Sequence, residues 1–219
     1  MVEITDLQFA YPHRGFGLCI PSLTIASEEK LAVVGPSGTG KTTLLNLIAG
    51  LISPRRGCIR VGDTDVCGLS DGARRRFRAR NIGFIFQDFA LLDYLTVREN
   101  ILYPYRITPA LKLDGQVRQR AQGLAVACGL GDKLQRRPGA LSQGEQQRVA
   151  ICRALITQPR LLLADEATGN LDPDNKSLIL GLLFERIREA RATLIAVTHD
   201  HDLLPHFDRV VDFAAFGQA

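Results

Sequence analysis

One stretch sets the architecture of this chain: residues 31–51 read LAVVGPSGTGKTTLLNLIAGL. The first four residues are all apolar, which is typical of a strand buried on both faces of a parallel sheet covered by helices. The next eight, GPSGTGKT, match the pattern G-x4-G-K-[ST], and a helical segment follows them. A buried strand, a glycine-rich loop and a helix in this order predict an α/β domain that binds phosphate groups on the loop.

The chemistry of this loop is that of an anion site. Gly38 and Gly40 let the backbone turn tightly and direct N–H groups inward, and the helix N-terminus adds positive potential. Lys41 reaches the outer phosphates of a nucleoside triphosphate, and the Thr42 hydroxyl can ligate Mg²⁺. The loop residues predicted to contact ATP are Gly35, Pro36, Ser37, Gly38, Thr39, Gly40, Lys41, Thr42 and Thr43.

A pair of carboxylates follows another apolar run. Residues 161–164, LLLA, predict a buried strand, and Asp165 and Glu166 stand at its end. Asp165 is placed to hold Mg²⁺ through water, and Glu166 is the natural general base for an attacking water. A strand that ends in Asp-Glu is by itself more often followed by a solvated loop. The phosphate loop in the same chain instead favours hydrolysis of the bound ATP.

The rest of the chain alternates short apolar runs with longer helical patterns. Strands are predicted at Ile4–Phe9, Leu18–Ile25, Lys30–Val34, Cys58–Val61, Ile82–Phe86, Leu161–Ala164, Thr193–Thr198 and Arg209–Phe213. Helices are predicted at Lys41–Ala49, Asp71–Arg80, Val97–Ile101, Leu113–Cys128, Ser142–Thr157 and Pro173–Glu189. The first strand alternates polar with apolar residues and is expected at a sheet edge.

These elements predict a single α/β domain over residues 1–219, built as a P-loop NTPase core with a mostly parallel sheet. Residues of about 1–87 and 159–219 form the core. The strand-rich first sixty residues, broken by turn residues, indicate an antiparallel β layer beside it. Residues of about 88–158 lack a convincing strand pattern and are expected to form an inserted helical lobe.

Composition narrows the possible partners. A chain of 219 residues, 46% of them hydrophobic, can bury a substantial core, and a net charge of +4 is too small to indicate nucleic acid. The five cysteines lack the CxxC spacing of zinc or redox sites and are expected to be reduced, buried thiols. No run approaches the roughly 20 apolar residues that span a bilayer. A membrane partner is therefore expected to be another chain.

The signature segment, residues 141–148 or LSQGEQQR, begins another helix. Ser142 and Glu145 have the spacing of a capping box. Capping does not explain Gly144, because glycine in a helix costs about 1 kcal/mol relative to alanine. A glycine there lets a ligand approach the helix N-terminus, so we predict a second phosphate-facing surface. Its residues are Ser142, Gln143, Gly144 and Glu145.

The signature segment resembles that of the ABC ATPase family, and other motifs of that family occur in the expected order. Tyr11 stands where the family places an aromatic residue that stacks on adenine, although packing in the core is the alternative. Gln87 is similar to the glutamine that joins core and lobe and touches Mg²⁺ and water. Residues 169–172, GNLD, resemble the loop that crosses to a partner subunit. His199 resembles the histidine that contacts the γ-phosphate.

This resemblance covers essentially the whole chain and implies a head-to-tail homodimer. ATP would then lie between Lys41 of one copy and Ser142 of the other, an arrangement that the spacing alone does not show. Asp172 is expected to contribute to nucleotide binding. The catalytic residues implied are Glu166, His199 and Gln87. The Mg²⁺ ligands implied are Thr42, Gln87 and Asp165.

Within the family, TGNLD at 168–172 and LTVREN at 95–100 look most like the group of lipoprotein-releasing, macrolide-efflux and cell-division ATP-binding subunits. The resemblance implies an ATPase at the cytoplasmic face of the plasma membrane that powers a separate permease, for export or lipoprotein extraction. The permease is expected to contact the apolar segment from Phe86 to Leu95, unless these side chains only pack the lobe against the core. Ala167 replaces the proline usual in this group, so we expect altered rigidity in the turn after Glu166.

Other functions fit parts of the pattern. A soluble ABC ATPase acting on DNA or the ribosome would carry long coiled coils, zinc modules or a second cassette, which this sequence lacks. A lever complex in cell division stays open within the exporter-related group. A P-loop kinase would transfer phosphate to a small molecule, but the signature segment and Glu166 argue against it. The arginine-rich run at 74–80 is expected to be a solvated helix face near phosphate or a negatively charged membrane.

Overall fold

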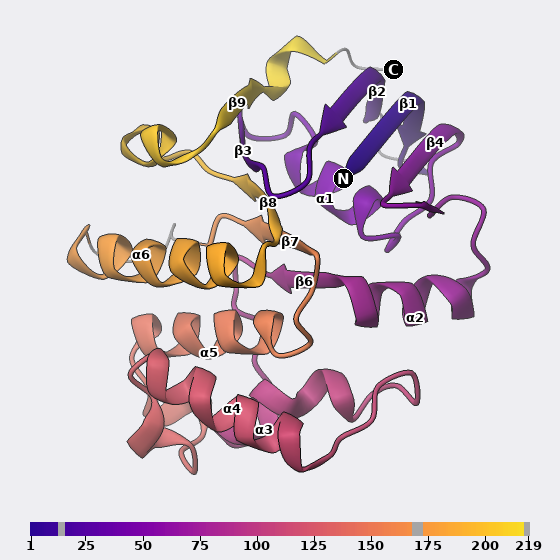
Figure 1. Cartoon of the computed structure of the whole chain (residues 1–219). Coiled ribbons are helices and arrows are strands. Elements are labelled where there is room, and N and C mark those ends of the chain that lie inside the picture. The colour runs from indigo at the N-terminus through magenta and orange to yellow at the C-terminus, as the bar shows by residue number, and fades with distance from the viewer. Residues whose placement is uncertain (13–15, 168–172, 217–219) are drawn as a thin grey trace.

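The computed structural model describes residues 1–12, 16–167 and 173–216, without the side chains of 173–178. These residues form two sheets (Figure 1). The larger sheet has the order β6-β7-β8-β3-β9, and every neighbouring pair in it is parallel. Its strands are β3 (Lys30–Val34), β6 (Ile82–Ile85), β7 (Leu161–Asp165), β8 (Thr193–Val197) and β9 (Arg209–Asp212). The predicted parallel sheet is therefore confirmed.

The smaller sheet is antiparallel and has the order β2-β1-β4-β5. Its strands are β1 (Val2–Ala10), β2 (Gly17–Ile25), β4 (Arg56–Val61) and β5 (Thr64–Asp65). The expected edge position of the first strand is wrong, because β1 lies between β2 and β4. Its alternating pattern reflects one buried and one exposed face. The two-residue strand β5 is too short to produce a recognisable period.

Helix α1 (Lys41–Ile48) lies between the two sheets. Leu161 and Leu163 of β7 belong to the hydrophobic cluster that contains the leucines of α1. Leu162 and Ala164 point to the opposite face and join the cluster formed with α5 (Gln143–Leu155) and α6 (Pro173–Ala190). The parallel sheet thus separates α1 from α5 and α6, as Figure 1 shows.

The helical lobe lies below the sheet in Figure 1, in pink and red. It contains α3 (Val97–Leu102), α4 (Gly115–Ala127), α5 and three short 3₁₀ turns. The turns span Tyr103–Tyr105, Gly131–Lys133 and Pro138–Ala140. The lobe has a hydrophobic cluster of its own and no strand between residues 88 and 158, as expected. Helix α4 begins two residues later than predicted, because the Asp114 side chain accepts a hydrogen bond from the N–H of Val117 and caps it.

The remaining elements include α2 (Asp71–Asn81) and two 3₁₀ turns at His201–His206 and Phe213–Ala215. In the ranges the structure describes, no helix is both long and apolar enough to cross a bilayer.

All five thiols are free. Cys128 and Cys152 are buried as expected, but Cys19, Cys58 and Cys67 are only half-buried. These three lie on or next to strands of the outer antiparallel sheet, one face of which meets solvent.

Candidate functional site

The phosphate loop joins the end of β3 to the start of α1. Gly38 and Gly40 have φ values of 83° and 102°, a region that favours glycine. A Cβ on Gly40 would also stand 2.7 Å from the ring of Phe16, so a larger residue would have to displace that ring. Helix α1 has no side-chain hydrogen bond capping its N-terminus. Its first backbone N–H groups therefore suit a bound anion.

Lys41 is buried within the loop. Its Nζ donates hydrogen bonds to the carbonyl oxygens of Gly35, at 2.7 Å, and Pro36, at 2.8 Å. The Thr39 hydroxyl donates to the same Pro36 oxygen at 2.9 Å. Burial lowers the pKa of Lys41, although the nearby carboxylates of Glu166 and Asp165 act in the opposite direction. The loop thus holds a partly desolvated ammonium group next to its own carbonyls.

Asp165 ends β7 and is buried. Burial raises its pKa, while a hydrogen bond with Thr42 acts to lower it. Among the described residues, its Oδ1 atom is buried without a hydrogen-bond partner. A buried, unpaired carboxylate oxygen beside a threonine hydroxyl is an oxygen donor set that suits Mg²⁺, which binds through one or two carboxylates together with phosphates.

Glu166 lies directly after β7, in a left-handed backbone conformation with a φ of 46°. Such a conformation is uncommon for a residue other than glycine and is often found at functional sites. Its Oε1 is 2.5 Å from Nε2 of His199, and its Oε2 accepts a hydrogen bond of 3.1 Å from the Gln87 amide. Three neighbouring strands, β6, β7 and β8, bring these residues together, because parallel strands end at the same edge of a sheet.

A cavity of about 400 Å³ connects these groups with the phosphate loop. The residues lining it are Tyr11, Phe16, Ser37, Gly38, Gly40, Lys41, Thr42, Thr43, Glu166 and His199. The cavity thus brings the predicted lysine, general base and histidine to one place.

Two aromatic rings border the cavity. The Tyr11 hydroxyl is 3.4 Å from Oγ1 of Thr43, and its ring packs edge-on against Phe9 at 4.7 Å between centroids. Phe16, whose ring centroid lies 6.0 Å from that of Tyr11, also lines the cavity. Sequence reasoning missed Phe16, because its only signal is an aromatic residue between two glycines. Its contact with Gly40 depends on the tertiary fold.

The signature segment starts α5 as predicted. The Ser142 hydroxyl accepts from the Glu145 N–H, and the Glu145 carboxylate accepts from the Ser142 N–H at 2.8 Å. Lys133 pairs with the same carboxylate at 2.5 Å. The hydrogen bonds from Lys133 and Ser142 lower the pKa of Glu145. This N-terminus is fixed rigidly by a complete capping box and a largely buried ion pair.

The signature segment does not line the cavity around Lys41. The reason lies in the layers of the fold, because α1 and α5 cover opposite faces of the parallel sheet. The loop, the carboxylates, Gln87 and His199 therefore gather at one site, while residues 142–145 form a separate one. Asp172 lies outside the described residues.

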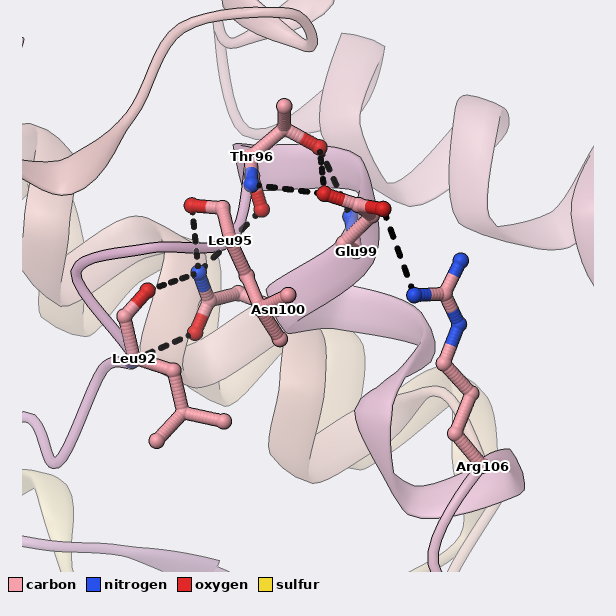
Figure 2. Close-up of polar contacts among 6 residues, drawn as sticks. All are labelled: Leu92, Leu95, Thr96, Glu99, Asn100 and Arg106. Atoms are coloured by element: carbon pink, nitrogen blue, oxygen red, sulfur yellow. Dashed lines mark hydrogen bonds and ion pairs between the residues drawn. The ribbon is translucent and has the colours of Figure 1, made fainter.

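The segment that follows Gln87 is held by Asn100, a residue that sequence reasoning did not select. Asn100 is fully buried, and Figure 2 shows its amide inside the turn before α3. It accepts from the Leu92 N–H at 2.8 Å and donates to the carbonyls of Leu92, Leu95 and Thr96 at 3.1 to 3.2 Å. Thr96 and Glu99 complete a capping box beside it. One side chain thus satisfies four backbone groups.

A second and larger cavity, of about 890 Å³, lies between α2, β6 and the segment after α3. From the predicted apolar segment 86–95, Phe86 and Ala90 line it. Leu91 instead packs against the core of the lobe, and Phe89 is buried. We call this cavity the α2 groove. Its other lining residues come from residues 50–51, from α2, β6 and residues 103–109, and from α5 and the residue Thr157 that follows it, which the sequence did not indicate.

Ala167 is partly buried against the hydrophobic cluster shared by β7, β8 and α6. It also borders a small apolar cavity with Leu183, Phe184 and Phe207. The turn after Glu166 therefore rests on apolar side chains.

Comparison with known proteins gives consistent matches. The model of the ABC transporter family matches residues 19–169. The lipoprotein-releasing system ATP-binding protein LolD of Cereibacter sphaeroides is 41% identical over 194 residues, covering 89% of this chain and 86% of that protein. The uncharacterized ABC transporter ATP-binding protein YvrO of Bacillus subtilis is 43% identical over 190 residues, covering 87% and 82%. The ATP-binding cassette MJ0796, solved as a dimer in a post-hydrolysis state with ADP and Pi, has a TM-score of 0.86 at 32% identity, covering 97% of this chain and 94% of that one.

Proposed function

This chain belongs to the ABC transporter family and is an ATP-binding, ATP-hydrolysing subunit. We propose that ATP binds on residues 35–43 and that a second copy of the chain completes the binding site. The observation that carries this proposal is the cavity that unites Lys41, Glu166 and His199. In this arrangement the N-terminus of α1 and the glycine-rich loop hold the phosphates. The Lys41 ammonium moves from the loop carbonyls to the outer phosphates.

Mg²⁺ fits beside the phosphates. The Thr42 hydroxyl and Asp165 would hold it, directly or through water, since the buried Oδ1 of Asp165 has no hydrogen bond to another described residue. The ion would neutralise charge on the β- and γ-phosphates. We also propose that Gln87 contacts the ion or the attacking water when the nucleotide is bound. In the described geometry its amide holds Glu166.

Glu166 is the proposed general base. Its carboxylate takes a proton from a water whose oxygen attacks the γ-phosphorus, while the bond from that phosphorus to the β–γ bridging oxygen breaks. ADP and inorganic phosphate leave. The hydrogen bond from Gln87 and the contact with His199 fix the position of the carboxylate. His199 is proposed to contact the γ-phosphate, and Tyr11 and Phe16 to border the adenine.

The second half of the site is proposed to come from another copy. Residues 142–145 lie on the far side of the sheet from α1, so within one chain they do not reach the cavity. The capping box fixes this helix N-terminus and uses the N–H groups of Ser142 and Glu145, so the N–H groups of Gln143 and Gly144 are the ones proposed to face the γ-phosphate. The dimeric cassette MJ0796 supports this arrangement. Asp172 is proposed to act at the same interface.

The physiological role that we propose is to power a separate membrane permease in lipoprotein extraction at the cytoplasmic face of the membrane. The lipoprotein-releasing proteins at 40 to 43% identity support this role. The permease is proposed to dock in the α2 groove, which is larger than the cavity around Lys41. The substrate is then selected by the permease rather than by this chain.

Measuring phosphate release from ATP alone, with Mg²⁺, tests the enzymatic part. We expect Lys41→Ala to lose tight ATP binding and Glu166→Gln to bind ATP yet fall by at least a hundredfold in turnover. Release of phosphate without another acceptor distinguishes hydrolysis from kinase chemistry. Turnover in Glu166→Gln near the wild-type rate would refute the general-base assignment. Co-purification with membrane subunits tests the transport role.

A further inference from the structure

The α2 groove combines an apolar floor with a basic wall. Its apolar residues include Leu51, Ile82, Phe84, Phe86, Tyr103 and Ile107. Four arginines and one aspartate supply the charged part of the lining: Arg75, Arg76, Arg78, Arg153 and Asp71. Leu51 and Ile107 expose 44% and 61% of their surface, so the floor is accessible from solvent. A groove of this kind suits a partner with both apolar and charged groups.

The four arginines of the groove outnumber the one carboxylate that lines it with them, Asp71. Arg75 pairs only with Asp71 of its own helix, at 2.8 Å, and both side chains are about two-thirds exposed. Arg76 makes no hydrogen bond or ion pair with another described residue. Arg78 donates to the carbonyls of Ala49 and Gly50 at 3.2 Å, and Asp71 acts on its charge without forming an ion pair with it among the described residues.

Arg153 also lines the groove and, like Arg78, donates hydrogen bonds to backbone carbonyls. It is buried, and its guanidinium donates to the carbonyl oxygens of Phe89 and Ala90. Burial is the main cause that lowers the pKa of both arginines, and Arg75 adds to the effect on Arg78. The groove therefore has an excess of positive charge beside apolar surface, a combination that attracts carboxylates.

We propose that the α2 groove receives a helical segment of the permease whose apolar face is flanked by carboxylates, and that Arg75 and Arg76 select this partner by charge. The inference rests on the proposed permease docking and adds the chemistry of the partner. An amphipathic helix lays its apolar face in such a groove. Guanidinium groups pair with carboxylates in a bidentate manner, and a segment carrying Lys or Arg at the same place would be repelled.

An anionic membrane surface is the competing occupant for a basic helix. Interfacial helices insert an apolar face among the lipids. Helix α2 has no such face, because its one large apolar residue, Phe77, packs against the protein core. The apolar residues near the arginines line a cavity instead of protruding together from α2. These features favour a protein segment.

Three synthetic peptides test the proposal. They share the apolar face of one amphipathic helix and carry Glu, Gln or Lys along its polar edge. Their binding to the full chain is followed by fluorescence anisotropy up to millimolar concentrations. We expect the Glu peptide to bind about tenfold more tightly than the Lys peptide, with the Gln peptide between them and the difference shrinking in high salt. Equal affinities, or no binding of the Glu peptide, would overturn the proposal.

Charge-reversal variants locate the effect. The double variant Arg75→Glu/Arg76→Glu should invert the preference for the Glu peptide, so that the Lys peptide binds more tightly than the Glu peptide. Arg55→Glu/Arg118→Glu, which makes the same change in charge at exposed sites that do not line the groove, should keep the wild-type order. An unchanged order in the first variant would contradict the selection by Arg75 and Arg76.

Two further readouts separate this inference from the proposed function. Basal ATP hydrolysis should stay unchanged in Arg75→Glu/Arg76→Glu, whereas a chain without hydrolysis would refute the enzymatic proposal itself. If Ile107→Glu weakens the binding of all three peptides equally and the arginine changes have no effect, docking in the groove is supported and selection by charge is refuted. If the arginine changes abolish sedimentation with phosphatidylglycerol vesicles but leave the peptide order unaltered, the surface binds membrane and the proposal is wrong.

Discussion

Asp165 carries a charge that the folded chain solvates poorly. Its carboxylate is buried, with Oδ1 unpaired among the described residues, and burial raises its pKa. An acid whose pKa rises on folding destabilises the protein at neutral pH, and this cost disappears as the pH falls below the unfolded pKa. The fold therefore gives up stability to keep an ionised oxygen at the place where we propose that Mg²⁺ binds.

We predict that Asp165→Asn raises the melting temperature without nucleotide by about 2–4 °C, corresponding to roughly 1 kcal/mol, and abolishes hydrolysis. The asparagine keeps an acceptor for Thr42 but removes the buried charge. Scanning calorimetry and phosphate release measure the two effects. Asp63→Asn, at an exposed position, is the control and should change neither. A lower melting temperature in Asp165→Asn would contradict the account.

The pKa of Glu145 shifts in the opposite direction from that of Asp165. Hydrogen bonds from Lys133 and from the Ser142 N–H lower its pKa below the ordinary value of 4.5. An acid of this kind stabilises the folded state above its unfolded pKa, and the contribution is lost as the pH falls through the folded pKa. The start of α5, with the predicted γ-phosphate surface, thus depends on an ionised Glu145.

We therefore predict that the free energy of unfolding of the wild type exceeds that of Glu145→Gln at pH 7, and that the difference shrinks as the pH falls below about 4.5. Urea denaturation at several pH values measures it. Comparing the two proteins cancels the other carboxylates, which titrate in both. A difference that stays constant from pH 7 to pH 3 would show that the Glu145 charge does not stabilise the helix.

At the scale of elements, the turn before α3 depends on one buried amide (Figure 2). Asn100→Leu removes the partners of the Leu92 N–H and of three carbonyls, so we predict a loss of about 2–4 kcal/mol in stability. Urea unfolding provides the measurement. Asn81→Leu loses a single hydrogen bond to the Phe77 carbonyl and should cost less than about 1 kcal/mol. Equal costs for both variants would argue against the role of Asn100.

Most elements could be predicted from the sequence, because their signals are local. The apolar runs gave the buried strands β3, β7 and β8, and Ser142 with Glu145 gave the start of α5. The central position of β1 could not be predicted, because an alternating pattern does not identify a strand's neighbours. Strand β5 has too few residues to show a period.

In the candidate site, too, the residues with local sequence signals could be predicted and those that depend on tertiary contacts could not. Lys41, Asp165 and Glu166 were predictable because each stands at a strand end or in the loop that follows one. Phe16 and Asn100 were not, because their contacts join segments that only the fold brings together. The basic wall of the α2 groove was predicted only as a solvated helix face. Its apolar floor comes from other parts of the chain.

At the scale of the whole molecule, the order of the layers explains why a single chain is proposed to supply only half of each ATP site. The parallel sheet lies between α1 and α5, so the phosphate loop and the signature segment face different surroundings. The head-to-tail pair that we propose would place each segment opposite the other in two equivalent sites. In this proposal, binding of ATP stabilises the pair and hydrolysis weakens it.

The molar mass of Glu166→Gln in solution, determined by light scattering with and without ATP, tests this claim most directly. The variant binds ATP without consuming it, so we predict a mass of one chain without nucleotide and of two chains with ATP. Ser142→Arg in the same background should stay at one chain with ATP bound. A Glu166→Gln protein that binds ATP and remains a single chain, or a Ser142→Arg derivative that pairs equally well, would contradict the composite site.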